Sequence, residues 1–297
     1  MRFTAQLIAI VTGLFIAHLA TAASPEPQRW VSAGGALTEW IVALGGESHL
    51  VGVDSTSQHP PSVKSLPGIG YQRQLSAEGI LTLRPKILIG TEEMGPPPVI
   101  QQLRTAGVQV EVLSASAELP ALRANLERLG ALLGNEGEAR QLSDQYIQRL
   151  AAEHERVMQL KRSAPGVLLL VSHAGSAPMV AGAGTVGDWL IAQAGGRNLA
   201  THTGYKVFSN EALSGLNPDV LVVSDRAQKG VQPREALLRE NPLLGATRAV
   251  RDNRVIEIDP TLLVGGLGPR LPDAVKPLAD AFYPDASVLH ARVSNAQ

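Results

Sequence analysis

Two stretches of the sequence, GYQRQLSAEGILTLRPKILIG at 70–90 and GYKVFSNEALSGLNPDVLVVS at 204–224, follow the same plan. Each begins with Gly-Tyr, continues with Ser-x-Glu and an apolar run, and ends with Pro and a short aliphatic segment. An offset of 133 residues places the Ser-x-Glu of the first copy on that of the second. The chain therefore contains two related lobes, and the cleft between two lobes is a common place for a ligand.

Short aliphatic runs, bounded by Gly, Pro or Ser, alternate with helical patterns around both copies. In the first half we expect strands at 51–55, 86–90 and 108–114, and helices at 37–44, 76–83 and 98–106. In the second half we expect strands at 166–173, 178–182, 219–224 and 254–259, and helices at 185–194, 234–239 and 271–282. Such alternation is typical of parallel sheets, so the sequence predicts two Rossmann-like α/β lobes with parallel sheets.

A long helical segment separates the two halves. Residues 138–161 contain neither Gly nor Pro and would extend about 36 Å as a helix. An apolar stripe at helical spacing runs along them: Leu142, Tyr146, Leu150, Val157 and Leu160. This segment is long enough to bridge two lobes, although it also fits an ordinary helix packed within one domain.

The resulting division is a signal peptide at 1–23, an N-terminal lobe at 24–135, a single bridging helix at 136–162 and a C-terminal lobe at 163–297. The signal peptide is predicted from Arg2, an apolar run at 7–19 that is too short to span a bilayer, and a small-residue cleavage site. We therefore expect the mature protein in the periplasm.

Composition excludes several kinds of site. The chain has no cysteine, which excludes disulfides, a lipid-modified cysteine and thiolate-bound metals. The net charge of −1 provides no basic field, so nucleic acid is not an expected partner. The histidines form no zinc-binding pair at the usual spacings.

Two motifs point weakly to enzymes. A formal G-x-G-x-x-G at Gly182, Gly184 and Gly187 does not directly follow the first strand of a βαβ unit, so a glycine-rich turn into a helix fits better than a nucleotide site. Ser172 lacks the glycines of a nucleophile elbow. His173 ends a strand where ligands bind in parallel sheets, and it also fits a hydrogen-bonded histidine.

The two copies differ just after their shared Gly-Tyr. Tyr71 is followed two residues later by Arg73, whereas Tyr205 is followed by Val207. A guanidinium favours the phenolate form of a nearby tyrosine, and ferric iron favours it more strongly. Tyrosinate is an established haem ligand, but most tyrosines on loops only pack or cap, so Tyr-x-Arg alone leaves both interpretations open.

The residues that the copies share have a structural explanation. Ser76 and Ser209 can cap helices, and Glu78 and Glu211 then lie in the first turn, near the positive end of the helix dipole. Capping does not require an exposed glutamate at the same place on both lobes. A matched pair also suits a two-point contact with a basic partner.

Taken together, RWVSAGGALTEWIVALGG, VGVDSTS, LPGIGYQRQLSAEGILTLRPKILIG and the second copy resemble the periplasmic haem-binding proteins of bacterial haem ABC importers. The resemblance covers essentially the whole mature chain. Its most specific element is GYxRxLSxEG at 70–79, and SHAGSAPMVAGAGT and GGLGPRLP are also typical. In this class, which includes cobalamin and siderophore binders, one long helix joins two α/β lobes.

The resemblance implies specific roles for residues of the cleft. Tyr71 matches the axial ligand of the haem iron, and Arg73 matches the arginine that supports the tyrosinate or contacts the porphyrin edge. Arg226, at the end of a strand, is expected to contact a propionate or the distal face of the haem. His173 is the candidate for a histidine that holds a second haem in some relatives.

The implied partners follow from the same resemblance. Glu78 and Glu211 match the paired glutamates that dock onto arginines of an inner-membrane permease dimer. The sequence thus predicts a monomeric haem b carrier and no enzyme, with an outer-membrane haem receptor system upstream. The alternatives are the same fold with a ferric siderophore or cobalamin, and an exported α/β enzyme of hydrolase type.

Overall fold

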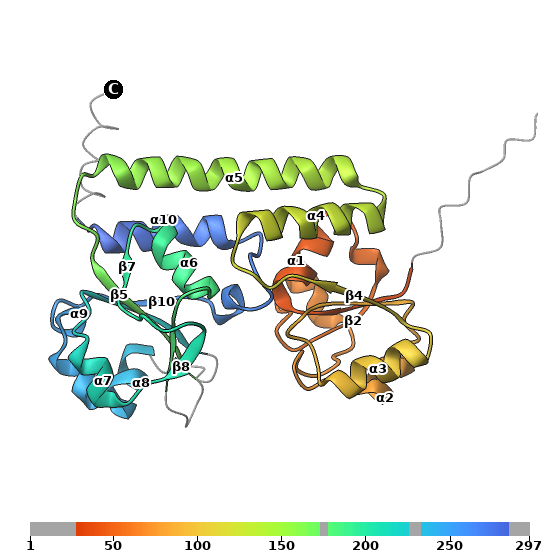
Figure 1. The fold of residues 1–297 in the computed structure, drawn as a ribbon, viewed down its shortest axis with the longest axis horizontal. Helices are drawn as coiled ribbons and strands as arrows, with labels where there is room; N and C mark the ends of the chain where they lie inside the picture. The colour runs from red at the N-terminus through yellow and green to blue at the C-terminus, as the bar shows by residue number, and fades with distance from the viewer. Residues whose placement is uncertain (1–27, 173–177, 226–232, 285–297) are drawn as a thin grey trace, which may run out of the picture.

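The computed structural model describes residues 28–172, 178–225 and 233–284, which form two α/β lobes under one long helix (Figure 1). The predicted signal peptide lies outside the described residues. Among the described residues, no helix combines the length and apolar character that crossing a membrane requires. The division at residues 135 and 163 that we proposed from the sequence is retained below to name the lobes.

Lobe one is built on a fully parallel sheet. Its elements are β1 (Trp30–Ala33), α1 (Gly35–Ala43), η1 (Glu47–His49), β2 (Leu50–Val53), η2 (Pro61–Ser65), α2 (Ala77–Thr82), β3 (Ile87–Thr91), α3 (Pro97–Thr105), β4 (Gln109–Leu113) and α4 (Leu119–Leu133). The strand order is β2-β1-β3-β4, and every pair is parallel, as predicted. The sequence analysis did not predict β1, a strand of only four residues that Gly34 alone separates from α1.

Lobe two carries a mixed sheet. Its elements are β5 (Gly166–Ser172), β6 (Met179–Ala181), α6 (Val186–Gln193), β7 (Arg197–Asn198), β8 (Tyr205–Val207), α7 (Asn210–Gly215), β9 (Val220–Asp225), α8 (Pro233–Glu240), η3 (Pro242–Ala246), α9 (Arg248–Arg251), β10 (Val255–Glu257), η4 (Pro260–Leu263) and α10 (Leu271–Phe282). The strand order is β10-β9-β5-β6-β8, and β7 also pairs with β5.

The prediction of a parallel sheet is wrong for one edge of lobe two. β6 runs antiparallel to β5, and β8 runs antiparallel to β6, whereas β5, β9 and β10 are parallel. Only residues 173–178 separate β5 from β6. A parallel connection needs a crossover of a dozen or more residues, so this short link forces the chain to turn back.

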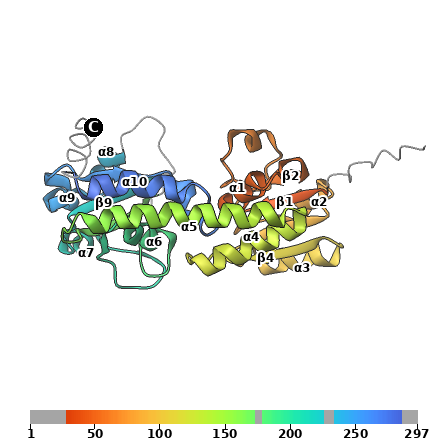
Figure 2. The ribbon, with the colours of Figure 1, turned by 90° about the horizontal axis from the view of Figure 1, so that it is seen from above.

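The long helix α5 (Glu136–Gln159) lies inside the range predicted for the bridge and extends over both lobes (Figures 1 and 2). Its buried residues recur on one side at helical spacing: Ala139, Ser143, Tyr146, Leu150 and Val157. All of these except Ser143 belong to a continuous core cluster that includes residues of both lobes, of α4 and of α10. The bridge is therefore packed along its length.

Both sheets are buried on two faces. In β5, Val167 and Leu169 join the core cluster beneath α5, whereas Leu168 and Leu170 join a second cluster with α7 and α8. Lobe one repeats this arrangement, with a third cluster between its sheet and the helices α2 and α3. Alternate side chains of a strand point to opposite faces, so the central strands β1, β3, β5 and β9 each contribute to two apolar layers.

Candidate functional site

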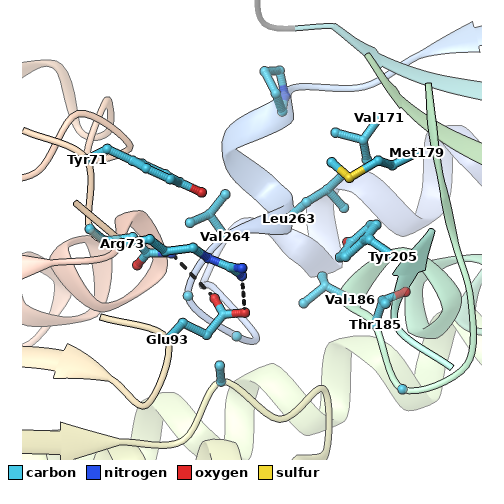
Figure 3. Close-up of a pocket in the computed structure, with 17 residues that line it drawn as sticks. Tyr71, Arg73, Glu93, Val171, Met179, Thr185, Val186, Tyr205, Leu263 and Val264 are labelled. Atoms are coloured by element: carbon cyan, nitrogen blue, oxygen red, sulfur yellow. Dashed lines mark hydrogen bonds and ion pairs between the residues drawn. The ribbon is translucent and has the colours of Figure 1, made fainter. Parts of the chain in front are cut away.

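Tyr71 lies on a loop that hydrogen bonds hold on both sides. The amide of Ser55 donates to the carbonyl of Gly70 over 2.8 Å, and the amide of Gly95 donates to the carbonyl of Gln72 over 2.9 Å. Gly70 has a φ of 87°, a left-handed conformation that glycine adopts without strain. The backbone on either side of Tyr71 is thus fixed, and the half-buried phenol points away from lobe one into open space (Figure 3).

That space is a cleft between the lobes with a volume of about 470 Å³, within the roughly 300–1,000 Å³ range of small-molecule sites. Lobe one contributes Tyr71, Gln72, Arg73, Glu93 and Ala115. Lobe two contributes Val171, Met179, Gly184, Thr185, Val186, Gly204, Tyr205, Pro260, Leu263, Val264, Gly265 and Gly266. The described residues that line the cleft therefore come from both lobes, as the repeat predicted.

The charged side chains among the described residues that line the cleft lie on the lobe-one side. Arg73 Nη2 donates to Glu93 Oε1 over 2.5 Å, beside the phenol of Tyr71 (Figure 3). The Gln72 side chain is buried, and its Nε2 donates to the other oxygen of Glu93 over 3.4 Å. The buried Oε1 of Gln72 has no hydrogen-bond partner within the part of the chain that the structure describes. This wall combines a phenol, a cation, an anion and an amide.

The lobe-two side of the cleft is largely apolar. Val171, Met179 and Leu263 lie across the cleft from Tyr71, and Tyr205 faces the same space (Figure 3). Tyr205, to which the sequence analysis assigned no role in the site, thus also lines the cleft. Tyr205 belongs to β8, a strand that the sequence analysis did not predict and that pairs antiparallel with β6.

A segment of lobe two, residues 259–270, reaches lobe one behind the cleft; we call it the cross-lobe segment. The amide of Ala36 donates to Val264 over 3.2 Å, and the indole of Trp40 donates to Leu267 over 2.8 Å. The positive φ values of Gly265 (87°) and Gly266 (86°) allow the chain to turn here against lobe one. Lobe-two backbone thus forms the back wall of the cleft while hydrogen-bonded to α1.

Arg270 fixes the end of the cross-lobe segment. Its guanidinium donates to both oxygens of Glu39 in α1, over 2.9 and 2.8 Å, to Asp259 over 2.7 Å and to Thr261 over 2.6 Å. Burial alone would lower the pKa of Arg270, but its bonds to Glu39 and Asp259 outweigh burial and raise it. Asp259 also pairs with His59 of lobe one at 3.0 Å. This network ties the two lobes together beside the cleft.

Two of the predicted site residues, His173 and Arg226, lie outside the described residues. The strands that precede them are described: β5 ends at Ser172, and β9 ends at Asp225. Among the described residues, no group of three or more His, Asp or Glu side chains is arranged to hold a metal ion.

Glu78 and Glu211 are exposed in the first turns of α2 and α7, outside the cleft. As predicted, Ser76 accepts from the amide of Gly79 over 3.4 Å, and Ser209 accepts from the amide of Ala212 over 3.2 Å. Hydrogen bonds from its own amide and from Ser209 lower the pKa of Glu211. Both helices lie on the side of the molecule opposite α5 (Figure 1), so the two glutamates belong to one face.

Sequence reasoning missed Gln72, Glu93 and Met179 as residues of the cleft. Met179 and Gly184 lie in the run SHAGSAPMVAGAGT, and Gly265 lies in GGLGPRLP. The sequence analysis noted both runs as typical of the family, but it assigned none of these three residues to the cleft. Glu93 had no such signal, because it follows β3 and meets Arg73 only in the folded protein.

Comparisons with known proteins agree with the two-lobe fold. A family model for periplasmic binding proteins matches residues 31–262. The crystal structure of a periplasmic haem-binding protein from Pseudomonas aeruginosa is 58% identical to this chain, with a TM-score of 0.85, and the match covers 87% of this chain and 94% of that one. The apo form of RhuT, a periplasmic haem-binding protein from Roseiflexus sp. RS-1, is 38% identical with a TM-score of 0.81, and the match covers 88% of this chain and 100% of that one.

A further relative has a different stated ligand. The cobalamin-binding protein of Halobacterium salinarum is 25% identical over 264 residues, which covers 87% of this chain and 70% of that protein.

Proposed function

Because this chain belongs to the periplasmic binding protein family, we propose that it binds haem between its lobes and delivers it to an inner-membrane ABC permease. The observation that carries the proposal is the position of Tyr71, whose phenol points into the cleft from a loop fixed on both sides. The similarity to haem-binding proteins at 58% and 38% identity supports haem over other cargoes.

The chemistry of the cleft suits haem. Haem presents an apolar plate, a ferric ion that favours an anionic oxygen ligand, and two carboxylates. Tyr71 would supply the oxygen, Arg73 would support the tyrosinate or bind a carboxylate, and the apolar side chains of lobe two would cover the plate. One protein ligand is also consistent with a carrier that must release what it binds.

Several finer assignments belong to this proposal. The cargo is haem b, and the protein is a monomeric periplasmic carrier rather than an enzyme, receiving haem from an outer-membrane receptor system. Arg226 would bind a propionate or face the distal side of the haem, and His173 would contact the haem or a second one. Glu78 and Glu211 would dock on the permease dimer, since both are exposed and the helices that carry them, α2 and α7, lie on the side of the molecule opposite α5.

The test is a hemin titration with matched tyrosine variants. The wild-type protein should develop a Soret band and a phenolate-to-iron charge-transfer band, and Tyr71→Phe should lose the charge-transfer band and most of its affinity. Tyr205→Phe removes the same phenol from the opposite wall of the cleft and should keep the charge-transfer band. If Tyr71→Phe binds hemin like the wild type, the ligand assignment is wrong.

The same protein should be titrated with cyanocobalamin and with a ferric siderophore. These ligands test the alternative cargoes, of which cobalamin has a specific relative in its favour. If the protein bound cyanocobalamin tightly and did not respond to hemin, cobalamin would replace haem as the proposed cargo.

A further inference from the structure

The charges that line the cleft cancel. Among its described lining residues, Arg73 is the one cation and Glu93 the one anion, and they are paired at 2.5 Å. Haem brings two carboxylates, and its tyrosinate ligand brings a further negative charge. Any of these groups that approaches Arg73 meets a guanidinium already bonded to a carboxylate.

Glu93 is the more firmly held member of this pair. Its amide donates to Thr91 Oγ1 over 3.3 Å, and its second carboxylate oxygen accepts from the buried Gln72 over 3.4 Å. Its side chain is 33% exposed, whereas that of Arg73 is 52% exposed. A ligand can therefore draw the longer and more exposed Arg73 away, while Glu93 stays in the wall of the cleft.

We propose that Glu93 is an internal competitor for Arg73 that weakens haem binding and favours release. This inference rests on the proposed function. Two effects act in the same direction: Glu93 occupies a donor that the tyrosinate or a haem carboxylate would use, and its charge repels those same anionic groups. In a carrier, an anion at this position limits the affinity so that the permease can take the cargo.

The experiment compares Glu93→Gln with Glu92→Gln, one residue away. Glu92 accepts from the amide of Ala115 and does not contact Arg73, and glutamine can keep that bond, so the control removes the same charge from the same loop. Hemin affinity is measured by titration, and release is measured by transfer to apomyoglobin. Glu93→Gln should bind hemin about tenfold more tightly and release it correspondingly more slowly, the lower end of the roughly ten- to hundredfold effect of a hydrogen bond to a charged group. Glu92→Gln should behave as the wild type.

A double-mutant cycle tests whether Glu93 acts through Arg73. In an Arg73→Gln background, Glu93→Gln should raise the affinity much less, because Glu93 then has no Arg73 to compete for and only its direct repulsion of the ligand is removed. Glu93→Ala provides a second variant, and thermal unfolding of each protein shows that it is folded.

Three results would overturn the inference: unchanged or weaker hemin binding by Glu93→Gln, an equal gain in Glu92→Gln, or an undiminished gain in the Arg73→Gln background. Weaker binding would mean that Glu93 positions Arg73 for the ligand instead of competing with it, and unchanged binding would mean that Glu93 does not affect the affinity. A wild-type protein that binds no hemin would overturn the proposed function and this inference together, and is thus distinct from the other three.

Discussion

Replacing Arg270 with methionine should destabilise the protein strongly at neutral pH and much less in mild acid. Arg270 is the cation that the carboxylate of Glu39 meets in α1, and the Glu39 side chain is only 6% exposed. Removing one partner of a buried ion pair typically costs about 3–5 kcal/mol, because it leaves an uncompensated buried charge. Methionine keeps much of the apolar volume, so the loss is mainly of charge and hydrogen bonds.

Protonation sets a limit on this cost. A stranded glutamate can take up a proton, which for an ordinary glutamate pKa of about 4.3 requires about 4 kcal/mol at pH 7 and about 1 kcal/mol at pH 5. The Arg270 side chain is 27% exposed, so water screens part of the effect. We therefore expect Arg270→Met to lose about 2–4 kcal/mol at pH 7 and about 1–2 kcal/mol at pH 5, the remainder being its bonds to Asp259 and Thr261.

Urea unfolding followed by far-UV circular dichroism at both pH values measures these free energies. The matched control combines Arg270→Met with Glu39→Gln, which leaves no unpaired buried carboxylate at position 39. In this double variant, the loss in the free energy of unfolding should depend much less on pH. If Arg270→Met lowered the free energy of unfolding by less than about 1 kcal/mol at pH 7, or by the same amount at both pH values, the argument from an unpaired Glu39 carboxylate would be refuted.

The other predictions concern acid stability, backbone packing and docking. Burial would raise the pKa of Asp259, but hydrogen bonds from Thr261 and Arg270 and the charge of Arg270 outweigh it and hold the pKa below its usual value. The Asp259 carboxylate therefore stabilises the fold above its unfolded pKa of about 3.9, and this contribution is lost as pH falls through the lower folded pKa. Asp259→Asn should therefore make the urea midpoint fall less steeply below about pH 4. Gly182→Ala should destabilise by about 1–3 kcal/mol or more in the same assay, because a Cβ there would lie 2.2 Å from the carbonyl oxygen of His202. The double variant Glu78→Lys with Glu211→Lys should keep its hemin affinity and fail to stimulate the permease ATPase. If stimulation is unimpaired, both glutamates serve only to stabilise the first turns of their helices.

Local sequence patterns predicted much of the fold because they report local physics. The bridging helix follows from a 24-residue segment with an apolar stripe, and α5 buries Tyr146, Leu150 and Val157 of that stripe. The capping serines followed from Ser-x-Glu alone, since an N-cap depends on neighbours three residues away. Comparison of the two copies singled out Tyr71 because Arg73 follows it where Val207 follows Tyr205, and the family resemblance then suggested its role as a haem ligand.

Features that depend on distant contacts were not accessible in this way. Glu93 meets Arg73 only because the loop after β3 folds against the loop before α2. The cross-lobe segment reads as a glycine-rich loop, and nothing in VGGLGPRLP at 264–272 shows that its backbone will bond to Ala36 and Trp40, more than two hundred residues earlier. The direction of β6 was decided by the length of the connection before it, a constraint that its own three residues do not carry.

The two connections between the lobes bear on how the protein controls its cargo. Closing the lobes on a ligand would bend a helix whose stripe is packed from Ala139 to Val157 and would disturb the bonds of Arg270 to Glu39. Hinged binding proteins avoid such costs by concentrating the motion in a few loop residues. Here the cleft is already formed, so little affinity can be gained or lost through closure. Control of binding must then act within the fixed cleft, and the pairing of Arg73 with Glu93 beside Tyr71 is a place where a ligand can change the balance of charges without moving either lobe.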